Sequence, residues 1–518
     1  MSALPQIGPF ESQTRHLFSN WSDEHQALDL WVTSVANHKL VIYFRTGQMN
    51  IKHLIFGLLP LQSYGQYNEA KKEFEKAIAG TGSQDFFERV FALIDSLQGK
   101  NSKDTCGAFD LDSTLIDHSI KGPTFAYQLK NAKYDFKETD LDTVFGFVEA
   151  EAGKDCIPPK SFTFRTEGKS VRINFGKIVE SIKKEFRNSN MKPNEKDVRD
   201  LIVSWDHASY RFMSGKPKCR YLMSTLKLRL MYKMTDVQKN DLIKEVLEYH
   251  SNPGINIKND KVDLLEVSER VQQVTLRAKM SRAFKEQIAL IKALKERNVK
   301  VFLNTATHDL YSKAVIAHFG LGIDGENVRG SFPLTNAMTQ RLSTRKRAVI
   351  AHFGLGIDGE NVRGSFPLTN AMTQRLSTRK RGFFNAIIEQ RKAYQLPALE
   401  TYKELSISDD EAIVRGIGYS NDGANKEVTM QHAMGSCNFV ITSGDYPGGD
   451  GHMLAHAVRN GGFALVLLAQ DKSADGWMDL KNLGGTHVRI QYQDDAAWLK
   501  ETSPQIVSEL TGFYATFV

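Results

Sequence analysis

Short apolar segments alternate with amphipathic segments through the second half of the chain. Apolar residues at spacings of three and four lie between the short segments and are typical of helices. The short segments are typical of strands: VKVFLNT (299–305), NFVITS (438–443), GGFALVLLA (461–469) and THVRIQY (486–492). Strands that alternate with helices predict an α/β fold with a doubly wound parallel sheet, in which chemistry lies beyond the carboxyl ends of the strands.

The pattern divides the chain into three parts. Helical spacing from about Phe10 to Gly99 predicts a helical N-terminal domain over residues 1–104. The parallel sheet is expected to take residues 105–118 and 299–518. The residues between, 119–298, mix both patterns and predict an inserted α/β cap domain. Within it, SFTFRT and SVRINF flank a glycine and predict a hairpin.

One segment occurs twice. Residues 314–347 and 348–381 are identical at all 34 positions. Identity of this kind indicates a recent duplication or an error in assembling the sequence. A helical solenoid is disfavoured, because two copies are too few to stack into a core. One copy is therefore expected in the fold and the other as an insertion.

Composition and charge narrow the class of protein. The 518 residues are 41% hydrophobic and 25% charged, which excludes collagen-like, disordered and membrane-embedded chains. A net charge of +7 on this length gives no argument for a nucleic-acid partner. The apolar stretch over 40–61 is interrupted by Arg45 and Lys52, and the first residues lack a secretory pattern. The four cysteines form no CxxC pair, so reduced thiols and a cytoplasmic location are expected.

The first candidate group for catalysis directly follows an apolar strand in FDLDSTLID. Asp110 and Asp112 lie two residues apart on a turn, where their carboxylates can converge on a divalent cation. One carboxylate can then attack phosphorus while the other moves protons. The alternative is a turn in which Ser113 or Thr114 caps the next helix. The motif alone favours neither.

Three further candidates follow at the starts or ends of predicted elements. Thr305, with Thr307 as its alternative, ends a strand and can bind a phosphoryl oxygen or simply cap a helix. Lys380 begins a helix and can offset negative charge, although its neighbours suggest a solvated basic run and its copy Lys346 is a rival. Asp422 follows the strand AIVRGIGYS and can complete a Mg²⁺ site or be a plain turn residue.

The order of these residues resembles the haloacid dehalogenase (HAD) superfamily, on its phosphoserine-phosphatase-like and 5′-nucleotidase-like branch. FDLDSTLID is similar to that family's first motif, and the later candidates match by their order. The resemblance implies that Asp110 is a nucleophile that forms an aspartyl-phosphate and that Asp112 is the acid and base. It implies that Thr114, Thr305 and Lys380 bind a small phosphorylated substrate. Mg²⁺ would be held by Asp110, Asp112, Asp422 and an acid near it.

The sequence departs from this family around the last motif. Lys426 occupies the position where relatives carry a second aspartate, whereas Glu427 fits the family's other spacing of acid, four residues, acid. Glu427 is therefore expected to be the remaining metal ligand. An inward Lys426 would instead weaken the metal site.

The resulting hypothesis is a Mg²⁺-dependent phosphomonoester hydrolase acting on a small metabolite or nucleotide. One alternative is a HAD-like binding or scaffold protein with impaired catalysis, which Lys426 and the duplication motivate. Another is a protein-directed phosphatase whose partner docks on the N-terminal helices. These three hypotheses differ in whether the site turns over small phosphate esters and in what the first hundred residues contribute.

Overall fold

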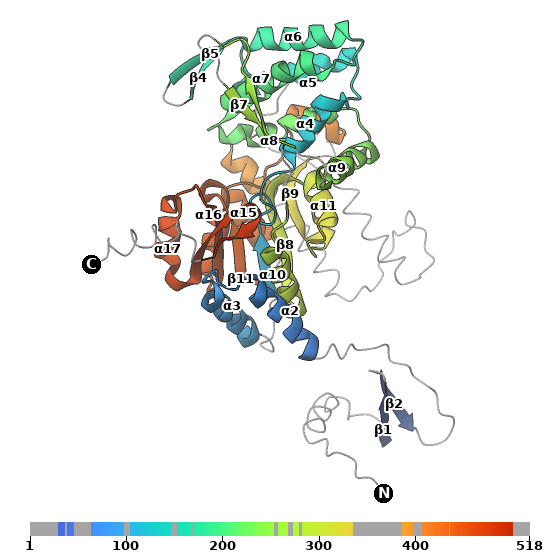
Figure 1. The fold of residues 1–518 in the computed structure, drawn as a ribbon, viewed down its shortest axis with the longest axis vertical. Helices are drawn as coiled ribbons and strands as arrows, with labels where there is room; N and C mark the ends of the chain where they lie inside the picture. Colours follow the sequence, from blue (N-terminus) through green and yellow to red (C-terminus); the bar gives the residue numbers. More distant parts are fainter. Residues whose placement is uncertain are drawn as a thin grey trace, which may run out of the picture. The chain divides into compact units, whose positions relative to one another are not determined.

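The computed structural model (Figure 1) divides into two units, residues 1–68 and 69–518, which are described separately below. It describes residues 29–36, 39–45, 64–97, 104–147, 153–166, 169–252, 257–267, 273–278, 282–334, 386–396, 407–434 and 436–500.

The first unit contains a pair of antiparallel strands. They are β1 (Asp29–Ala36) and β2 (Lys39–Arg45). The prediction of helix throughout residues 10–99 is therefore wrong over these two segments. Both are rich in β-branched and aromatic residues, as in KLVIYFR, and such residues favour a pleated strand over a helix. Helices are found further along, as α2 (Tyr64–Ala77) and α3 (Gln84–Leu97).

The second unit is built on a sheet of eight strands in the order β10-β9-β8-β3-β11-β12-β13-β14. Six neighbouring strands, from β9 to β13 in that order, run parallel, and the two edge strands pair antiparallel. This confirms a mostly parallel α/β sheet. The strands are β3 (Asp104–Phe109), β8 (Lys300–His308), β9 (Val328–Pro333), β10 (Gly418–Tyr419), β11 (Cys437–Gly444), β12 (Phe463–Ala469), β13 (Val488–Asp494) and β14 (Ala497–Trp498).

The strand order reverses direction around β3. The chain first adds β8 and β9 on one side of β3, then returns to add β11, β12 and β13 on the other. The carboxyl ends of β3, β8 and β11 therefore meet at one edge, where the connections leave in opposite directions. Such a switch point leaves a crevice that neighbouring helices do not fill.

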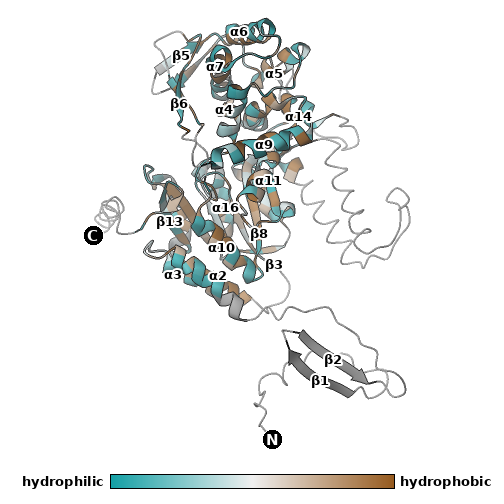
Figure 2. Ribbon diagram, turned by 45° about the vertical axis from the view of Figure 1, so that its right-hand side comes forward, coloured by the Kyte–Doolittle hydropathy of each residue, from teal (hydrophilic) through white to brown (hydrophobic). Residues whose placement is uncertain are grey.

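Helices cover both faces of the sheet, as residue alternation in β12 makes plain. Phe463, Leu465 and Leu467 face one core, while the residues between them face the other. Figure 2 shows hydrophobic residues in the strand β8. The first core receives α2, α3, α10 (Lys285–Glu296) and α11 (Asp309–His318); the second receives α15 (Ala424–Ala433), α16 (Pro447–Arg459) and α17 (Met478–Gly484).

Two helices of the predicted N-terminal domain thus belong to the core of the sheet. Phe74 of α2 and Phe87 of α3 are buried in that core, and the Phe87 ring stacks on Trp498 of β14. The helix α10, predicted as part of the cap, packs there as well. Boundaries drawn from the sequence pattern alone missed both, because amphipathic spacing shows that a helix has an apolar face but not what covers it.

Most residues between β3 and α10 form a cap with its own hydrophobic core. The exception is α9, whose buried apolar side chains, within residues 242–247, belong to the core of the sheet. The centre of the cap core is the buried Trp205, whose indole Nε1 donates to the carbonyl of Phe145 at 2.9 Å. The predicted hairpin is confirmed as β4 paired with β5. The elements are α4 (Lys121–Asn131), α5 (Leu141–Phe145), β4 (Phe162–Thr166), β5 (Lys169–Ile173), α6 (Phe175–Asn188), α7 (Glu195–Met213), α8 (Arg220–Ser224), α9 (Asp236–Ser251), β6 (Asp260–Asp263) and β7 (Gln273–Leu276).

Buried polar contacts join the cap to the elements beside the sheet. The guanidinium of Arg229 is 1% exposed and donates to the carbonyls of Val144 and Val414, each at 2.7 Å. Val414 belongs to α14 (Asp409–Arg415), which leads into β10. Nearby, the buried ring of Tyr221 from α8 packs directly over Gly418 of β10. These contacts fix the cap above the carboxyl edge of the sheet.

Two disulfide bonds join the four cysteines, Cys106 to Cys437 and Cys156 to Cys219. The expectation of reduced thiols is therefore wrong. Cys106 and Cys437 lie on the adjacent strands β3 and β11, which bring their Cα atoms to 5.6 Å. Because 331 residues separate them along the chain, spacing in the sequence could not reveal the pair.

The repeated segment is only partly described. The start of the first copy, residues 314–334, forms the end of α11 and the strand β9 of the sheet. The second copy, 348–381, lies outside the described residues. No helix in the described ranges has the length and apolar character needed to cross a membrane.

The contact between Tyr221 and Gly418 yields a stability prediction. A Cβ at position 418 would lie 2.1 Å from the Tyr221 ring, so Gly418→Ala should lower the free energy of unfolding by about 1–3 kcal/mol. Gly451→Ala is the matched control, since nothing lies within 4 Å of its Cβ and alanine favours a helix by about 0.5–1 kcal/mol. Thermal melts should show a lower Tm for the first variant only. An unchanged Tm in Gly418→Ala would contradict this packing.

Candidate functional site

The candidate site begins where β3 ends. Asp110 is buried, and its backbone N–H donates to the carbonyl of Ser443 on β11 at 2.9 Å. The chain then turns tightly, with Ser113 in the left-handed region at φ 58°. The next helix, α4, begins only at Lys121, with Ile120 as its N-cap. Ser113 and Thr114 therefore do not cap it, and that structural alternative fails.

A buried lysine lies against Asp110. Lys426, in the first turn of α15, places Nζ 2.6 Å from Asp110 Oδ1 and 2.5 Å from Asp450 Oδ1. Its side chain is 2% exposed. Since desolvating an ammonium is costly, this arrangement is stable only because two carboxylates compensate its charge.

The loop after β11 supplies two more carboxylates. Asp445 follows the strand, and Asp450 lies in the first turns of α16. Asp450 Oδ2 accepts hydrogen bonds from the backbone N–H groups of Asp445 (2.9 Å) and Tyr446 (3.0 Å). A Cβ at Gly444 would lie 2.5 Å from Asp450, so glycine is needed for this close approach. Carboxylate oxygens of Asp110, Asp445 and Asp450 all lie within 4.8 Å of one another.

Burial and like charges perturb these acids. Burial raises the pKa of Asp110 to about 7, against the lowering effect of Lys426, and the charges of Asp450 and Asp112 add to the rise. Burial and the same neighbouring carboxylates raise the pKa of Asp445. Burial alone would lower the pKa of Lys426, but the charges of Asp110 and Asp450 outweigh it and raise that pKa. The ammonium therefore stays protonated.

Asp112 lies at the open side of the group. Its Oδ2 accepts a hydrogen bond from Thr307 Oγ1 at 2.6 Å and lies 3.3 Å from Lys121 Nζ. Its Oδ1 is buried and has no hydrogen-bond partner among the described residues. Thr305 lies two residues earlier in β8, and its hydroxyl oxygen accepts a hydrogen bond from the Thr307 N–H at 3.2 Å. Because β8 continues to His308, the contact with Asp112 comes from Thr307 rather than from Thr305.

Thr114, the other predicted substrate-binding hydroxyl, is fully buried behind the turn. Its backbone N–H donates to the carbonyl of Leu111 at 3.3 Å, and its Oγ1 has no hydrogen-bond partner in the described part of the chain. Lys380 and its copy Lys346 lie outside the described residues. The cation placed next to Asp110 in this structure is Lys426.

The two remaining predicted metal ligands do not join Asp110. Asp422 lies 3.3 Å from Arg220 Nη1 of the cap helix α8. Glu427 points to the opposite side of α15, where its carboxylate contacts Arg459 (3.2 Å) and His456 (3.3 Å). Consecutive helical residues are rotated by about 100°, so Lys426 and Glu427 cannot both face inward. The structure turns Lys426 inward.

Sequence reasoning missed Asp445 and Asp450, although a signal was present. Both lie in SGDYPGGDG, which directly follows the strand NFVITS. Their spacing is acid, four residues, acid, the spacing that was instead assigned to Asp422 and Glu427.

The group combines features that suit an oxygen-coordinated cation and an anionic substrate. Asp110 and Asp450 contact the buried ammonium of Lys426, Asp445 lies close to both of these acids, and the charge of Asp112 acts on Asp110. Asp112 Oδ1 has no hydrogen-bond partner among the described residues, and Asp445 adds a half-buried carboxylate. Hard divalent cations prefer such carboxylate oxygens. The residues present therefore fit Mg²⁺.

Comparisons with known proteins add no assignment. No known protein-family model and no curated protein matches the sequence. One solved structure that is similar is that of a conserved, functionally unknown protein from Anaerococcus prevotii DSM 20548, with 12% identity and a TM-score of 0.44. The match covers 80% of this chain and 95% of that one.

The buried ion pairs predict a pH-dependent effect of removing Lys426. Asp110 holds its proton to a pKa of about 7 when folded, but has an ordinary value of 3.8. The folded state therefore binds more protons, and stability falls as pH rises between these values. Without the ammonium the pKa of Asp110 should rise further, which extends this loss to higher pH.

In metal-free buffer, Lys426→Met should therefore lose more stability relative to the parent at about pH 8 than at about pH 5. The expected loss at the higher pH is about 3–5 kcal/mol. Melting temperatures across this range measure the effect, with Lys244→Met as an exposed control (72% exposed). Parallel profiles for the parent and Lys426→Met would contradict it.

Proposed function

We propose that this protein is a Mg²⁺-dependent phosphomonoester hydrolase that acts through an aspartyl-phosphate on Asp110. The observation that carries the proposal is the contact of Asp110 with Lys426 at the carboxyl end of β3, with Asp112 two residues further on. A carboxylate desolvated beside an ammonium, with a second carboxylate at the open side, suits nucleophilic attack followed by proton transfer.

The resemblance to the HAD superfamily supports the same reading with partly different residues. The order strand-end DxDxT, strand-end Thr, helix-start Lys and strand-end Asp is retained as Asp110 and Asp112, then Thr307, Lys426 and Asp445. Asp450 completes the spacing of two acids separated by four residues. All of these residues belong to one edge of the sheet.

In the proposed reaction a carboxylate oxygen of Asp110 attacks phosphorus, and the bond from phosphorus to the ester oxygen breaks. Asp112 gives a proton to the leaving alcohol. A water molecule then attacks the aspartyl-phosphate and passes its proton to Asp112, which releases phosphate and restores Asp110. Lys426 offsets the charge of Asp110 and the phosphoryl group, and the Thr307 hydroxyl orients Asp112.

Asp110, Asp112 and Asp445 are the residues that would hold Mg²⁺. Asp450 is engaged otherwise, because Lys426 and two backbone N–H groups take its oxygens. When bound, the ion would supply charge neutralisation between the carboxylates and the phosphoryl group.

The two alternatives lose part of their basis. A non-catalytic role depended on Lys426 displacing the metal, but Asp445 provides an acid that the sequence reading did not include. A docking role for the N-terminal helices needs free apolar faces on them. Phe74 and Phe87, on the apolar faces of α2 and α3, are buried in the core of the sheet.

The first test is hydrolysis of p-nitrophenyl phosphate with Mg²⁺ or with EDTA. The parent protein should show Mg²⁺-dependent turnover, and Asp110→Asn should lower kcat by at least about a thousandfold, because it removes the nucleophile. Asp155→Asn, an exposed change in the cap, is the control and should match the parent. Turnover that survives Asp110→Asn would rule out the aspartyl-phosphate route.

A second test separates the metal ligands seen here from those that the sequence suggested. Asp445→Asn should raise the Mg²⁺ concentration needed for half-maximal activity at least about tenfold, because a carboxylate ligand is lost. Asp422→Asn should change it by less than about threefold, since Asp422 contacts Arg220 instead. Magnesium titrations of both variants measure the difference. The reverse ranking would return Asp422 to the metal site.

A further inference from the structure

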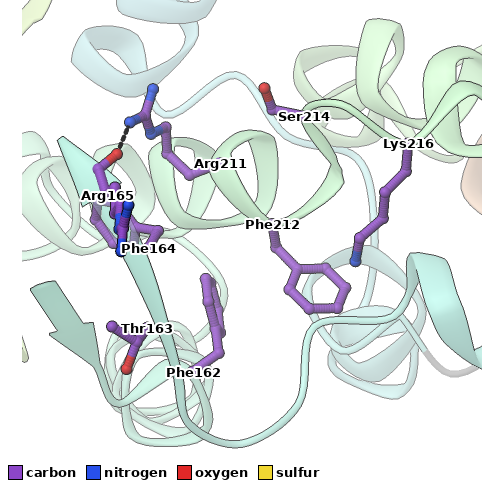
Figure 3. A pocket seen from close by; sticks show the side chains of 8 residues that line it. All are labelled: Phe162, Thr163, Phe164, Arg165, Arg211, Phe212, Ser214 and Lys216. Atoms are coloured by element: carbon purple, nitrogen blue, oxygen red, sulfur yellow. Dashed lines mark hydrogen bonds between the residues drawn. The ribbon is translucent and has the colours of Figure 1, made fainter. Parts of the chain in front are cut away.

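A hollow of about 410 Å³ opens in the cap, between the strand β4 and the end of α7. Its volume falls within the range of small-molecule sites. Figure 3 shows eight residues around it, of three chemical kinds. They are three phenylalanines (Phe162, Phe164, Phe212), three cations (Arg165, Arg211, Lys216) and two hydroxyl residues (Thr163, Ser214).

The three cations lack carboxylate partners. No described carboxylate lies within 4.0 Å of Arg165, Arg211 or Lys216. Arg211 donates to the main-chain carbonyl of Arg165, and Lys216 Nζ donates to that of Asp155 at 3.0 Å. The carboxylate of Asp155 is itself paired with Lys218, which does not line the hollow. The Asp155 carboxylate attracts Lys216 from beyond that distance, so the positive charge around the hollow is compensated only in part and attracts an anion.

The phenylalanines define the remaining part of the ligand. The Phe162 ring meets that of Phe212 edge-on, with centroids 5.1 Å apart. Arg211 lies over Phe164 at 5.6 Å, and Lys216 lies over Phe212 at 3.3 Å from the ring centre. Positive charges held against aromatic faces form a surface that suits both a phosphate and a flat ring.

We propose that this hollow is a nucleotide-binding site in the cap. The phosphates would lie between Arg211 and Lys216, and the base would pack against Phe162 and Phe212. The site is independent of the proposed hydrolase activity, since the residues that line it include none of the acids or the lysine around Asp110.

Titration calorimetry of the full chain with ADP in EDTA tests the proposal. ADP should bind at least about tenfold more tightly than adenosine or inorganic phosphate, because each supplies only half of the contacts. Arg211→Met with Lys216→Met should weaken ADP binding at least about tenfold. The matched control is Lys192→Met, an exposed cap residue outside the hollow, which should leave binding unchanged.

Photolabelling with 8-azido-ADP locates the site without any substitution. Mass spectrometry should find the label on peptides that contain residues 162–165 or 211–216. Labelling confined to peptides around Asp110 or Asp445 would overturn the proposal and place nucleotide at the sheet edge. The absence of ADP binding, or equal affinity in the double variant, would also overturn it, whether or not the protein hydrolyses phosphate esters.

Discussion

The buried ammonium of Lys426 is the interaction on which the candidate site depends. It bridges Asp110 on the turn after β3 and Asp450 in α16, two segments that are 340 positions apart in the sequence. Without the ammonium, these carboxylates would be desolvated close together with no counter-charge. With it, the three side chains hold β3, α15 and α16 in one arrangement. The group thus has both a structural role and an electrostatic one.

The topology explains why this arrangement is available. The carboxyl ends of parallel strands lie at the same edge of a sheet. Because β3 and β11 are neighbouring parallel strands, the acids that follow them lie close together. The hydrogen bond from the backbone N–H of Asp110 to the carbonyl of Ser443 fixes the register of these two strands. The cap is fixed over the same edge through Arg229 and Tyr221. Arg229 donates to main-chain carbonyls and Tyr221 packs on a glycine, so these contacts depend on a close steric fit rather than on ion pairs.

Sequence patterns predicted the local features well and the long-range ones poorly. The parallel sheet, the β4–β5 hairpin and the strand-end position of Asp110 and Asp112 follow from periodicity over a few residues. The choice between Lys426 and Glu427 depends on which side of α15 faces the sheet, and apolar periodicity is weak in that helix. The pairing of Cys106 with Cys437 depends on which strands become neighbours. Such properties are set by the topology, which no local window contains.

The charge balance of the site also bears on its chemistry. Four carboxylates, those of Asp110, Asp112, Asp445 and Asp450, are accompanied by Lys426 and, at 3.3 Å from Asp112, by Lys121. When all four are ionised, their negative charge exceeds the positive charge of the two ammonium groups, which is one reason why the pKa values of Asp110 and Asp445 are raised. A phosphate ester would add to that excess. Lys426 offsets only part of this charge, since Asp110 and Asp450 share its ammonium. A divalent cation would remove the excess, and for this reason Mg²⁺ is part of the proposed activity. The hollow in the cap is lined by cations instead, so the nucleotide site proposed there needs no metal ion.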